Sequence, residues 1–287
     1  MIKLYGAYKK VLRYSLILIS IFVLVGCTKR FFYNNLDWFV LEYLDDYVTL
    51  NQEQENLLEE RLSFLAEWHK KEELPRYVDH LKEMETMTEE DITLNYLQQS
   101  RDRFREHYYR IVSKVAPELF SLSLLLTPQQ QHEFLLNVQK DYNKRNAKYA
   151  DKTEKEVRKI VFDKTEEWVT EWIGELNNDQ QRYVTQFSNQ VILNSPLWRN
   201  YRASIYQELE YMFDNKSNSV IYQKVFMQLM FEPESFYSDQ LSQNMEHNVA
   251  LVDQLTLSLS RSMTEKQWNH FHGKVAEWRE LAQELLD

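Results

Sequence analysis

Glycine is nearly absent from this chain, and this limits what the chain can fold into. There are four glycines in 287 residues, and only Gly174 and Gly273 lie beyond residue 26. The tight turns of β-hairpins favour glycine, and loops that surround phosphate groups need several glycines at close spacing. The sequence contains no GxGxxG, GxxxxGK[ST] or GxSxG motif. We therefore predict an all-α fold.

Apolar residues recur with helical periodicity along almost the whole chain. Leu36, Tyr43/Leu44 and Tyr47/Val48 belong to one apolar stripe, with acidic residues on the opposite face. Further helices are predicted at about residues 52–73, 75–86, 89–115, 117–126, 128–173, 179–193, 196–213, 219–231, 236–262 and 265–286. Together they predict a multi-helix bundle of about ten helices.

The segment 128–173 has no clear internal stop signal. It is predicted either as one long central helix of about 70 Å or as two helices with a break near residues 143–146. We assign residues 31–287 to one helical domain, with a candidate seam between subdomains near residue 127.

Five segments share a pattern that starts helices, namely residues 50–54, 87–91, 126–130, 176–180 and 263–267. In each, an apolar residue precedes Thr or Asn, and Gln or Asp follows three residues later. Such a pair is predicted to form an N-cap with its capping-box partner. The irregular intervals between the five segments argue against a strict repeat.

The first 26 residues have the three parts of a bacterial signal peptide. The basic residues come first, and they are Lys3, Lys9, Lys10 and Arg13. The apolar segment from Ser15 to Val25 is too short to cross a hydrocarbon core of ~30 Å as a helix. The run Leu24-Val25-Gly26-Cys27 then fits the lipobox of bacterial lipoproteins. We predict a signal peptide at residues 1–26, cleavage before Cys27 and a short tether at residues 27–30. The alternatives are a transmembrane helix and an ordinary secretory signal.

Cys27 is the only cysteine, so no intramolecular disulfide can form. We expect it to carry covalent diacylglycerol and an N-acyl chain such as palmitate, and we expect no other cofactor. The next residue is Thr28. Asp at that position tends to retain lipoproteins of Gram-negative bacteria in the inner membrane. Thr28 therefore favours attachment to the periplasmic face of the outer membrane, with the inner membrane as the less favoured location.

The chain without its signal peptide is strongly acidic. Residues 1–26 contain four basic residues and no acidic ones, which leaves 30 basic and 44 acidic residues and a net charge of −14. A surface of this charge repels the phosphate backbone of nucleic acids. We therefore exclude nucleic acid as a general partner.

One segment has the opposite charge. Twelve of the twenty residues from 140 to 159 are charged, and eight of these are basic. On one continuous helix the lysines would occupy a single arc, and they are Lys140, Lys144, Lys148, Lys152, Lys155 and Lys159. This lysine strip is interpreted either as a solvated helix face or as a docking site for an anionic partner. The anionic candidates are a phospholipid surface, peptidoglycan and an acidic envelope protein.

No constellation of residues indicates catalysis or metal binding. The histidines show neither the HExxH nor the Glu-x-x-His spacing of metal sites. His69 has Glu72 and Glu73 nearby, which is interpreted as part of a charged surface. Glu234-Ser235 resembles the catalytic start of lytic transglycosylases but lacks their downstream glycine loop, and we interpret it as an early helix turn. We assign no catalytic residue and no metal ligand.

Motifs between about residues 20 and 80 resemble those of a known bacterial family. They are the lipobox, Phe32-Tyr33-Asn34-Asn35-Leu36-Asp37-Trp38, Tyr43-Leu44-Asp45-Asp46-Tyr47-Val48, Trp68-His69 and Glu73-Leu74-Pro75-Arg76-Tyr77. This set is similar to the lipoproteins with the domain of unknown function 6279. The resemblance implies an exported, lipid-anchored helical protein and carries no activity.

A second motif resembles a different family. Leu126-Thr127-Pro128-Gln129-Gln130 is similar to the LTxxQ motif of periplasmic chaperones of the Spy and CpxP type. We expect a non-enzymatic binding or structural protein of the cell envelope. The alternatives are a chaperone-like helical cradle and a peptidoglycan-acting enzyme that uses a carboxylate without a recognisable motif.

Overall fold

A computed structural model describes residues 35–286. Cys27, the lipobox and the tether therefore lie outside the described residues. The described part of the chain contains helices and connecting turns and no strand, which confirms the predicted all-α class. No helix in it is both long and apolar enough to cross a membrane.

The helices are α2 (Leu36–Asp45), α3 (Gln52–Trp68), α4 (Leu74–Glu85), α5 (Leu94–Ser123), α6 (Pro128–Ala150), α7 (Glu154–Ile173), α8 (Asn178–Gln190), α9 (Ser195–Asp214), α10 (Ser219–Phe231), α11 (Asp239–Ser262) and α12 (Glu265–Glu284). A π-helical turn, η1 (His69–Glu73), joins α3 to α4 without interruption. Short 3-10 turns, η2 (Glu89–Asp91) and η3 (Pro233–Phe236), precede α5 and α11.

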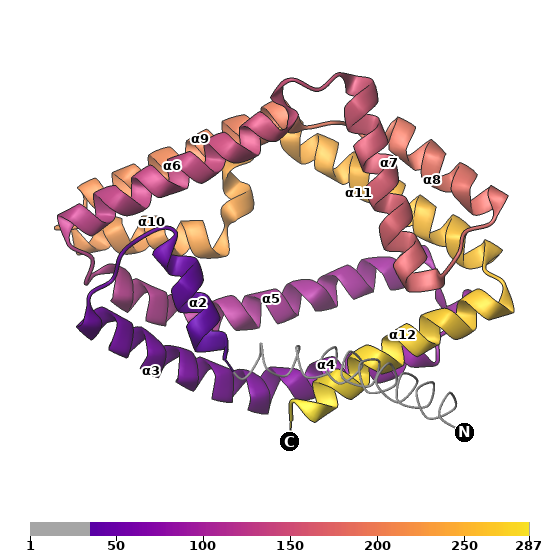
Figure 1. Cartoon of the computed structure of the whole chain (residues 1–287), viewed down its shortest axis with the longest axis horizontal. Coiled ribbons are helices and arrows are strands. Elements are labelled where there is room, and N and C mark those ends of the chain that lie inside the picture. The colour runs from indigo at the N-terminus through magenta and orange to yellow at the C-terminus, as the bar shows by residue number, and fades with distance from the viewer. Residues whose placement is uncertain (1–34, 287) are drawn as a thin grey trace, which may run out of the picture.

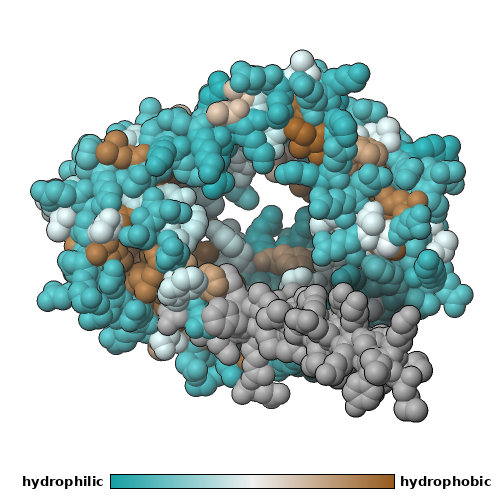
Figure 2. All heavy atoms as spheres, in the orientation of Figure 1, coloured by the Kyte–Doolittle hydropathy of each residue, from teal (hydrophilic) through white to brown (hydrophobic). Residues whose placement is uncertain are grey.

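The helices are arranged around a central opening (Figure 1). Helices α6 and α9 lie side by side along one edge, and α7, α8 and α11 pack together on another. Helix α5 and the packed pair α4 and α12 complete the frame. The opening is also visible between the side chains in the space-filling view (Figure 2). The fold is therefore a frame of helices, which closes where α12 packs against α4.

Two separate cores stabilise this frame. The first is formed by α5, α9 and α10, with Ala116 and Tyr222 completely buried. The second is formed by α7, α8 and α11, with Val184 completely buried at its centre. Burial of a large apolar side chain contributes about 1.5–3 kcal/mol. Each side of the opening is therefore anchored by its own core.

The five predicted helix starts are all capping boxes. They begin at Asn51, Thr88, Thr127, Asn177 and Thr264, and each N-cap is paired with the side chain three residues later. The start at Thr88 leads only into the 3-10 turn η2, and α5 begins after Thr93. The predicted helix at 89–115 was therefore placed too early.

The four glutamines of these capping boxes also meet in pairs. The amides of Gln54 and Gln130 exchange hydrogen bonds of 3.0 and 2.6 Å. Those of Gln180 and Gln267 do the same at 3.0 and 2.8 Å. Each amide also accepts from its own N-cap N–H and donates to a backbone carbonyl of the other segment. We call each arrangement a glutamine clasp, because it joins two helix starts that are distant in sequence.

The long helix predicted at 128–173 is wrong. It is divided into α6 and α7 by a turn at residues 151–153, and the alternative break at 143–146 is also wrong because those residues are helical. Thr153 is the N-cap of α7, and the Glu156 carboxylate accepts its N–H at 2.7 Å. This sixth capping box uses Glu where the other helices use Gln or Asp, and it was not predicted.

The helix boundaries expected near residues 74 and 116 are not interruptions of the helical run. Pro117 lies inside α5, which continues to Ser123, because the neighbouring Val112 and Ala116 are held in the first core. Pro75 lies in the first turn of α4, where its missing N–H is tolerated, and the π-helical turn before it keeps the run continuous. The seam predicted near residue 127 falls in the turn between α5 and α6 and stays a prediction.

Candidate functional site

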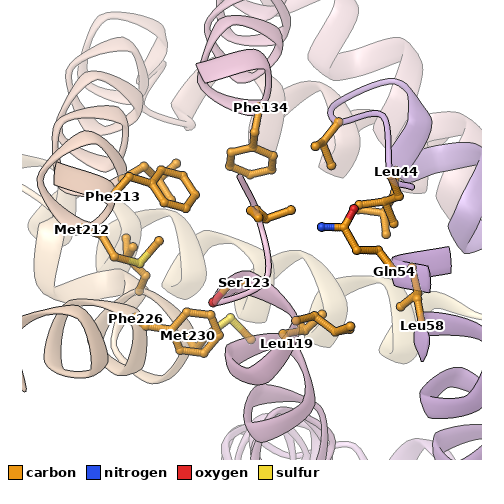
Figure 3. A pocket seen from close by; sticks show the side chains of 16 residues that line it. Leu44, Gln54, Leu58, Leu119, Ser123, Phe134, Met212, Phe213, Phe226 and Met230 are labelled. Atoms are coloured by element: carbon orange, nitrogen blue, oxygen red, sulfur yellow. The ribbon is translucent and has the colours of Figure 1, made fainter. Parts of the chain in front are cut away.

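An apolar cavity of about 300 Å³ lies where six helices converge. Each of these helices contributes at least one large apolar side chain to its lining, among them Leu44 (α2), Leu58 (α3), Leu119 (α5), Phe134 (α6), Met212 (α9) and Phe226 (α10). Figure 3 shows these side chains pointing toward a common space. Cavities of this size fall at the lower end of the range of ligand pockets.

The lining offers almost no free polar group. Gln54 lines the cavity, but its amide is engaged in the first glutamine clasp. Ser123 lines it too, and its hydroxyl donates to the Phe120 carbonyl at 2.7 Å. An apolar cavity stays dry and takes apolar ligands in preference to water. The cavity is therefore suited to a hydrocarbon chain or ring.

A second hollow of about 270 Å³ adjoins the cavity. The two share Leu44, Val48 and Leu50 in their walls. The second hollow is also lined by Trp38 and Leu41 and by three carboxylates, those of Glu42 and Asp45 on α2 and of Glu55 on α3. We call it the acidic hollow. Helix α2 contributes to both spaces and is the helix that follows the predicted anchor at Cys27. The cavity and the acidic hollow thus share a wall at α2, the first helix of the described residues.

The structure divides the predicted lysine strip. Lys140, Lys144 and Lys148 are on α6, Lys152 is in the turn, and Lys155 and Lys159 are on α7. Because α6 and α7 run in different directions, the six lysines do not form one arc (Figure 1). The prediction of a continuous strip is wrong, since it depended on one unbroken helix.

Two of the lysines nevertheless meet another part of the chain. Lys155 and Lys159 line a shallow hollow of about 540 Å³ between α7 and α8, together with Arg158, Phe162 and Ser188, and with Glu154, Thr185 and Asn189. Lys159 is paired with Asp163 at 2.7 Å, and Arg158 donates to the carbonyls of Ser188 and Val191. We call this the basic hollow. The binding of an anionic partner to it stays a prediction.

A buried carboxylate lies at the end of the π-helical turn. Glu73 is only 1% exposed, and its carboxylate accepts from Arg110 at 2.6 Å and lies 3.1 Å from the His107 ring nitrogen. Burial raises the pKa of Glu73. The hydrogen bonds from Arg110 and His107 lower it by more, so the net pKa is below its usual range. The interpretation of Glu73 as a surface residue was wrong.

His80 belongs to the same cluster. It is buried, its ring stacks against that of His107 with centroids 6.1 Å apart, and its Nε2 has no hydrogen-bond partner. Burial lowers the pKa of His80, and the positive charge of Arg103 lowers it further. The described residues contain no group of three potential metal ligands. The hydrogen bonds of Glu73 to His107 and Arg110 join η1 to α5.

The pair that resembles the lytic-transglycosylase motif lies in a short turn. Glu234 and Ser235 lie in the short turn η3, and the Ser235 hydroxyl donates to the Glu232 carbonyl at 2.6 Å. Neither residue lines a described pocket. The interpretation of this pair as a helical turn is confirmed.

Comparison with known families identifies the chain. The sequence model of a family of unknown function, DUF6279, matches residues 46–242, which is more than half of the chain. The chain belongs to the DUF6279 family. The match continues far beyond the motifs that suggested the family and includes every cavity-lining residue except Leu44. The lipobox lies outside the DUF6279 match.

Comparisons with curated proteins and with solved structures find no match to this DUF6279 chain. The resemblance to the Spy and CpxP chaperones therefore receives no support. In this chain the LTxxQ residues have a local role, since Thr127 caps α6 and Gln130 forms half of a glutamine clasp.

Sequence reasoning missed the cavity. A usable signal was present in α10, where Ser219–Phe231 carries apolar residues on more than one face. The run Leu124-Leu125-Leu126 at the end of α5 gives a similar signal. A helix that carries more apolar surface than one neighbouring helix can bury belongs either to a deep core or to the wall of a ligand cavity.

Proposed function

We propose that this protein is a lipid-anchored envelope protein that binds an apolar ligand without changing it chemically. The observation that carries the proposal is the apolar cavity, whose lining has no free polar group for catalysis and no charged side chain. The lipobox supports attachment through Cys27 to the periplasmic face of the outer membrane.

The position of the cavity supports the same proposal. Eight residues separate Cys27 from Leu36, the first residue of α2, and a chain of that length spans at most about 30 Å. Leu44 on α2 lines the cavity. An anchored protein would therefore hold its cavity close to the bilayer surface, where apolar ligands are concentrated.

The cavity is tested with a photoreactive alkyl chain that bears an uncharged sugar head. The full-length lipidated protein in nanodiscs should give saturable adducts at Met212 or Met230. Filling the cavity with Leu122→Phe and Leu209→Phe should reduce these adducts at least tenfold, because the added rings occupy the ligand's volume. The control Leu136→Phe changes an exposed residue of α6 outside the cavity and should leave them unchanged.

The same preparation tests the anchor. The variant Cys27→Ser should incorporate no labelled palmitate. Saturable adducts that are unaffected by cavity filling would overturn the binding proposal, and palmitate incorporation by Cys27→Ser would overturn the anchoring proposal.

A chaperone-like function is the second candidate. The observation that favours it is the number of exposed large apolar side chains on the frame, such as Phe104, Trp168 and Val220, which are 59%, 58% and 75% exposed. Such residues can contact unfolded clients. This function predicts that the protein suppresses aggregation of an unfolded client without ATP, and that cavity filling leaves the suppression intact.

A further inference from the structure

The acidic hollow concentrates negative charge beside the apolar cavity. Glu42, Asp45 and Glu55 line it, and no Lys, Arg or His lines either the hollow or the cavity. The Glu133 carboxylate is close as well, since it accepts from the Thr49 hydroxyl at 2.8 Å and from the Thr49 N–H at 3.2 Å. Carboxylates therefore lie close to the Val48–Leu50 segment, whose Val48 and Leu50 line both the cavity and the hollow.

These carboxylates are not neutralised within the described part of the chain. Glu42, Asp45 and Glu55 form no ion pair there, whereas the neighbouring Glu118 is paired with Arg61 at 3.3 Å. Unshared carboxylates next to an apolar space repel a ligand with an anionic head and attract one with a cationic head. Charge complementarity therefore selects among the apolar ligands that the cavity alone would accept.

The size of the cavity limits the ligand further. A cavity of about 150 Å³ in another protein takes one benzene molecule, and the present cavity has about 300 Å³. That volume suits one hydrocarbon chain and not the two chains of a phospholipid. A phospholipid would also bring its phosphate against the carboxylates of the hollow.

We propose that the natural ligand is a single-chain amphiphile with a cationic head of the ammonium type. Its tail occupies the apolar cavity, and its head lies among Glu42, Asp45 and Glu55. This inference rests on the proposed binding function and adds the class of ligand. In this proposal the acidic hollow selects the head group and the apolar cavity supplies the affinity for the tail.

Three photoreactive probes with the same dodecyl tail test the head group. Their heads are trimethylammonium, sulfate and maltoside, and each tail ends in a diazirine. With the full-length protein in phosphatidylcholine nanodiscs, the ammonium probe should label the cavity at a concentration about tenfold lower than the sulfate probe, as expected for three partly screened charge pairs. The difference should shrink as salt is raised from 0.1 M to 1 M.

Charge-removing variants locate the effect. The triple change Glu42→Gln, Asp45→Asn and Glu55→Gln should make the three probes label the cavity at similar concentrations. The matched control Glu167→Gln, Glu171→Gln and Asp214→Asn removes three exposed carboxylates elsewhere and should preserve the tenfold difference. Circular dichroism of both variants confirms that they are folded.

The outcomes separate this inference from the proposed function. Equal labelling of the cavity by all three probes in the unaltered protein would overturn the cationic head and leave the apolar binding function standing. Preference for the ammonium probe that survives the triple change would also overturn it. Absence of cavity adducts with every probe would overturn the binding function and the ligand class together.

Discussion

Glu73 of η1 and His80 of α4 are buried ionisable groups, and the surroundings of each lower its pKa. The neutral form of His80 is favoured because burial lowers its pKa. The charged form of Glu73 is favoured because Arg110 and His107 outweigh the cost of its burial. In both cases the unfolded chain binds more protons than the folded protein on the acid side, so acidification reduces stability.

The free energy of unfolding should therefore fall in two stages as pH decreases. The first stage follows the ordinary His pKa of 6.5, as His80 and also His69 are protonated in the unfolded chain. The second lies below the ordinary Glu pKa of 4.5, as Glu73 is protonated. Urea unfolding measured from pH 8 down to about pH 3 should show both stages.

Two variants test these assignments. The change His80→Leu should weaken the first stage and leave the second in place. The change Glu73→Ala should cost up to about 3–5 kcal/mol at pH 7, because it removes the buried carboxylate that accepts from the partly buried Arg110 guanidinium. A pH profile that is the same for His80→Leu and the unaltered protein would contradict the role of His80.

At the scale of helices, the glutamine clasps join elements that are far apart in sequence. One clasp connects the start of α3 to the start of α6, and the other connects the start of α8 to the start of α12. Gln180 is fully buried and Gln267 is 5% exposed, so each of their hydrogen bonds replaces one to water. The same side chain thus caps its own helix and fixes the position of another.

Removing half of a clasp should destabilise the fold. The change Gln267→Ala leaves the Glu175 carbonyl and the Thr264 N–H without the partner they have in the clasp, and it removes two of the hydrogen bonds of the buried Gln180 amide. It should cost at least about 2 kcal/mol. The control Gln181→Ala changes an exposed glutamine on α8 and should stay within about 0.5 kcal/mol. Equal urea midpoints for the two variants would show that the clasp does not stabilise the protein.

At the scale of the whole molecule, charge is unevenly distributed over an open frame. The basic hollow between α7 and α8 lies on a chain whose net charge is −14 without its predicted signal peptide. Helices α2 and α3, which contribute the carboxylates of the acidic hollow, lie across the frame from α7 and α8 (Figure 1). The frame therefore separates a surface suited to anions from the cavity that we propose for a cationic amphiphile.

The basic hollow should govern any binding to anionic envelope components. The change Lys155→Gln with Lys159→Gln should reduce recovery on anionic vesicles or purified peptidoglycan, and raised salt should reduce it further. The control Lys140→Gln with Lys144→Gln removes the same charge from α6 and should have a smaller effect. Similar recovery for both double variants would favour the interpretation of these lysines as a solvated surface.

The helical class and the helix starts were determined by the sequence alone. Scarcity of glycine and the periodicity of apolar residues are local properties, and so is the pairing of Thr or Asn with Gln three residues later. Each acts within one or two turns of helix, where the physical interactions depend on neighbours in sequence. For the same reason the family motifs were recognisable without a structure.

The tertiary structure decided where some of these helices end and which distant segments they contact. The chain stops α6 before Asp151 and continues α5 through Pro117, and neither outcome follows from local preference. The clasps, the buried Glu73 and the cavity all depend on contacts between segments more than 30 residues apart. Burial of this kind is decided by packing among several helices, because a side chain is enclosed only when all of its neighbours are in place.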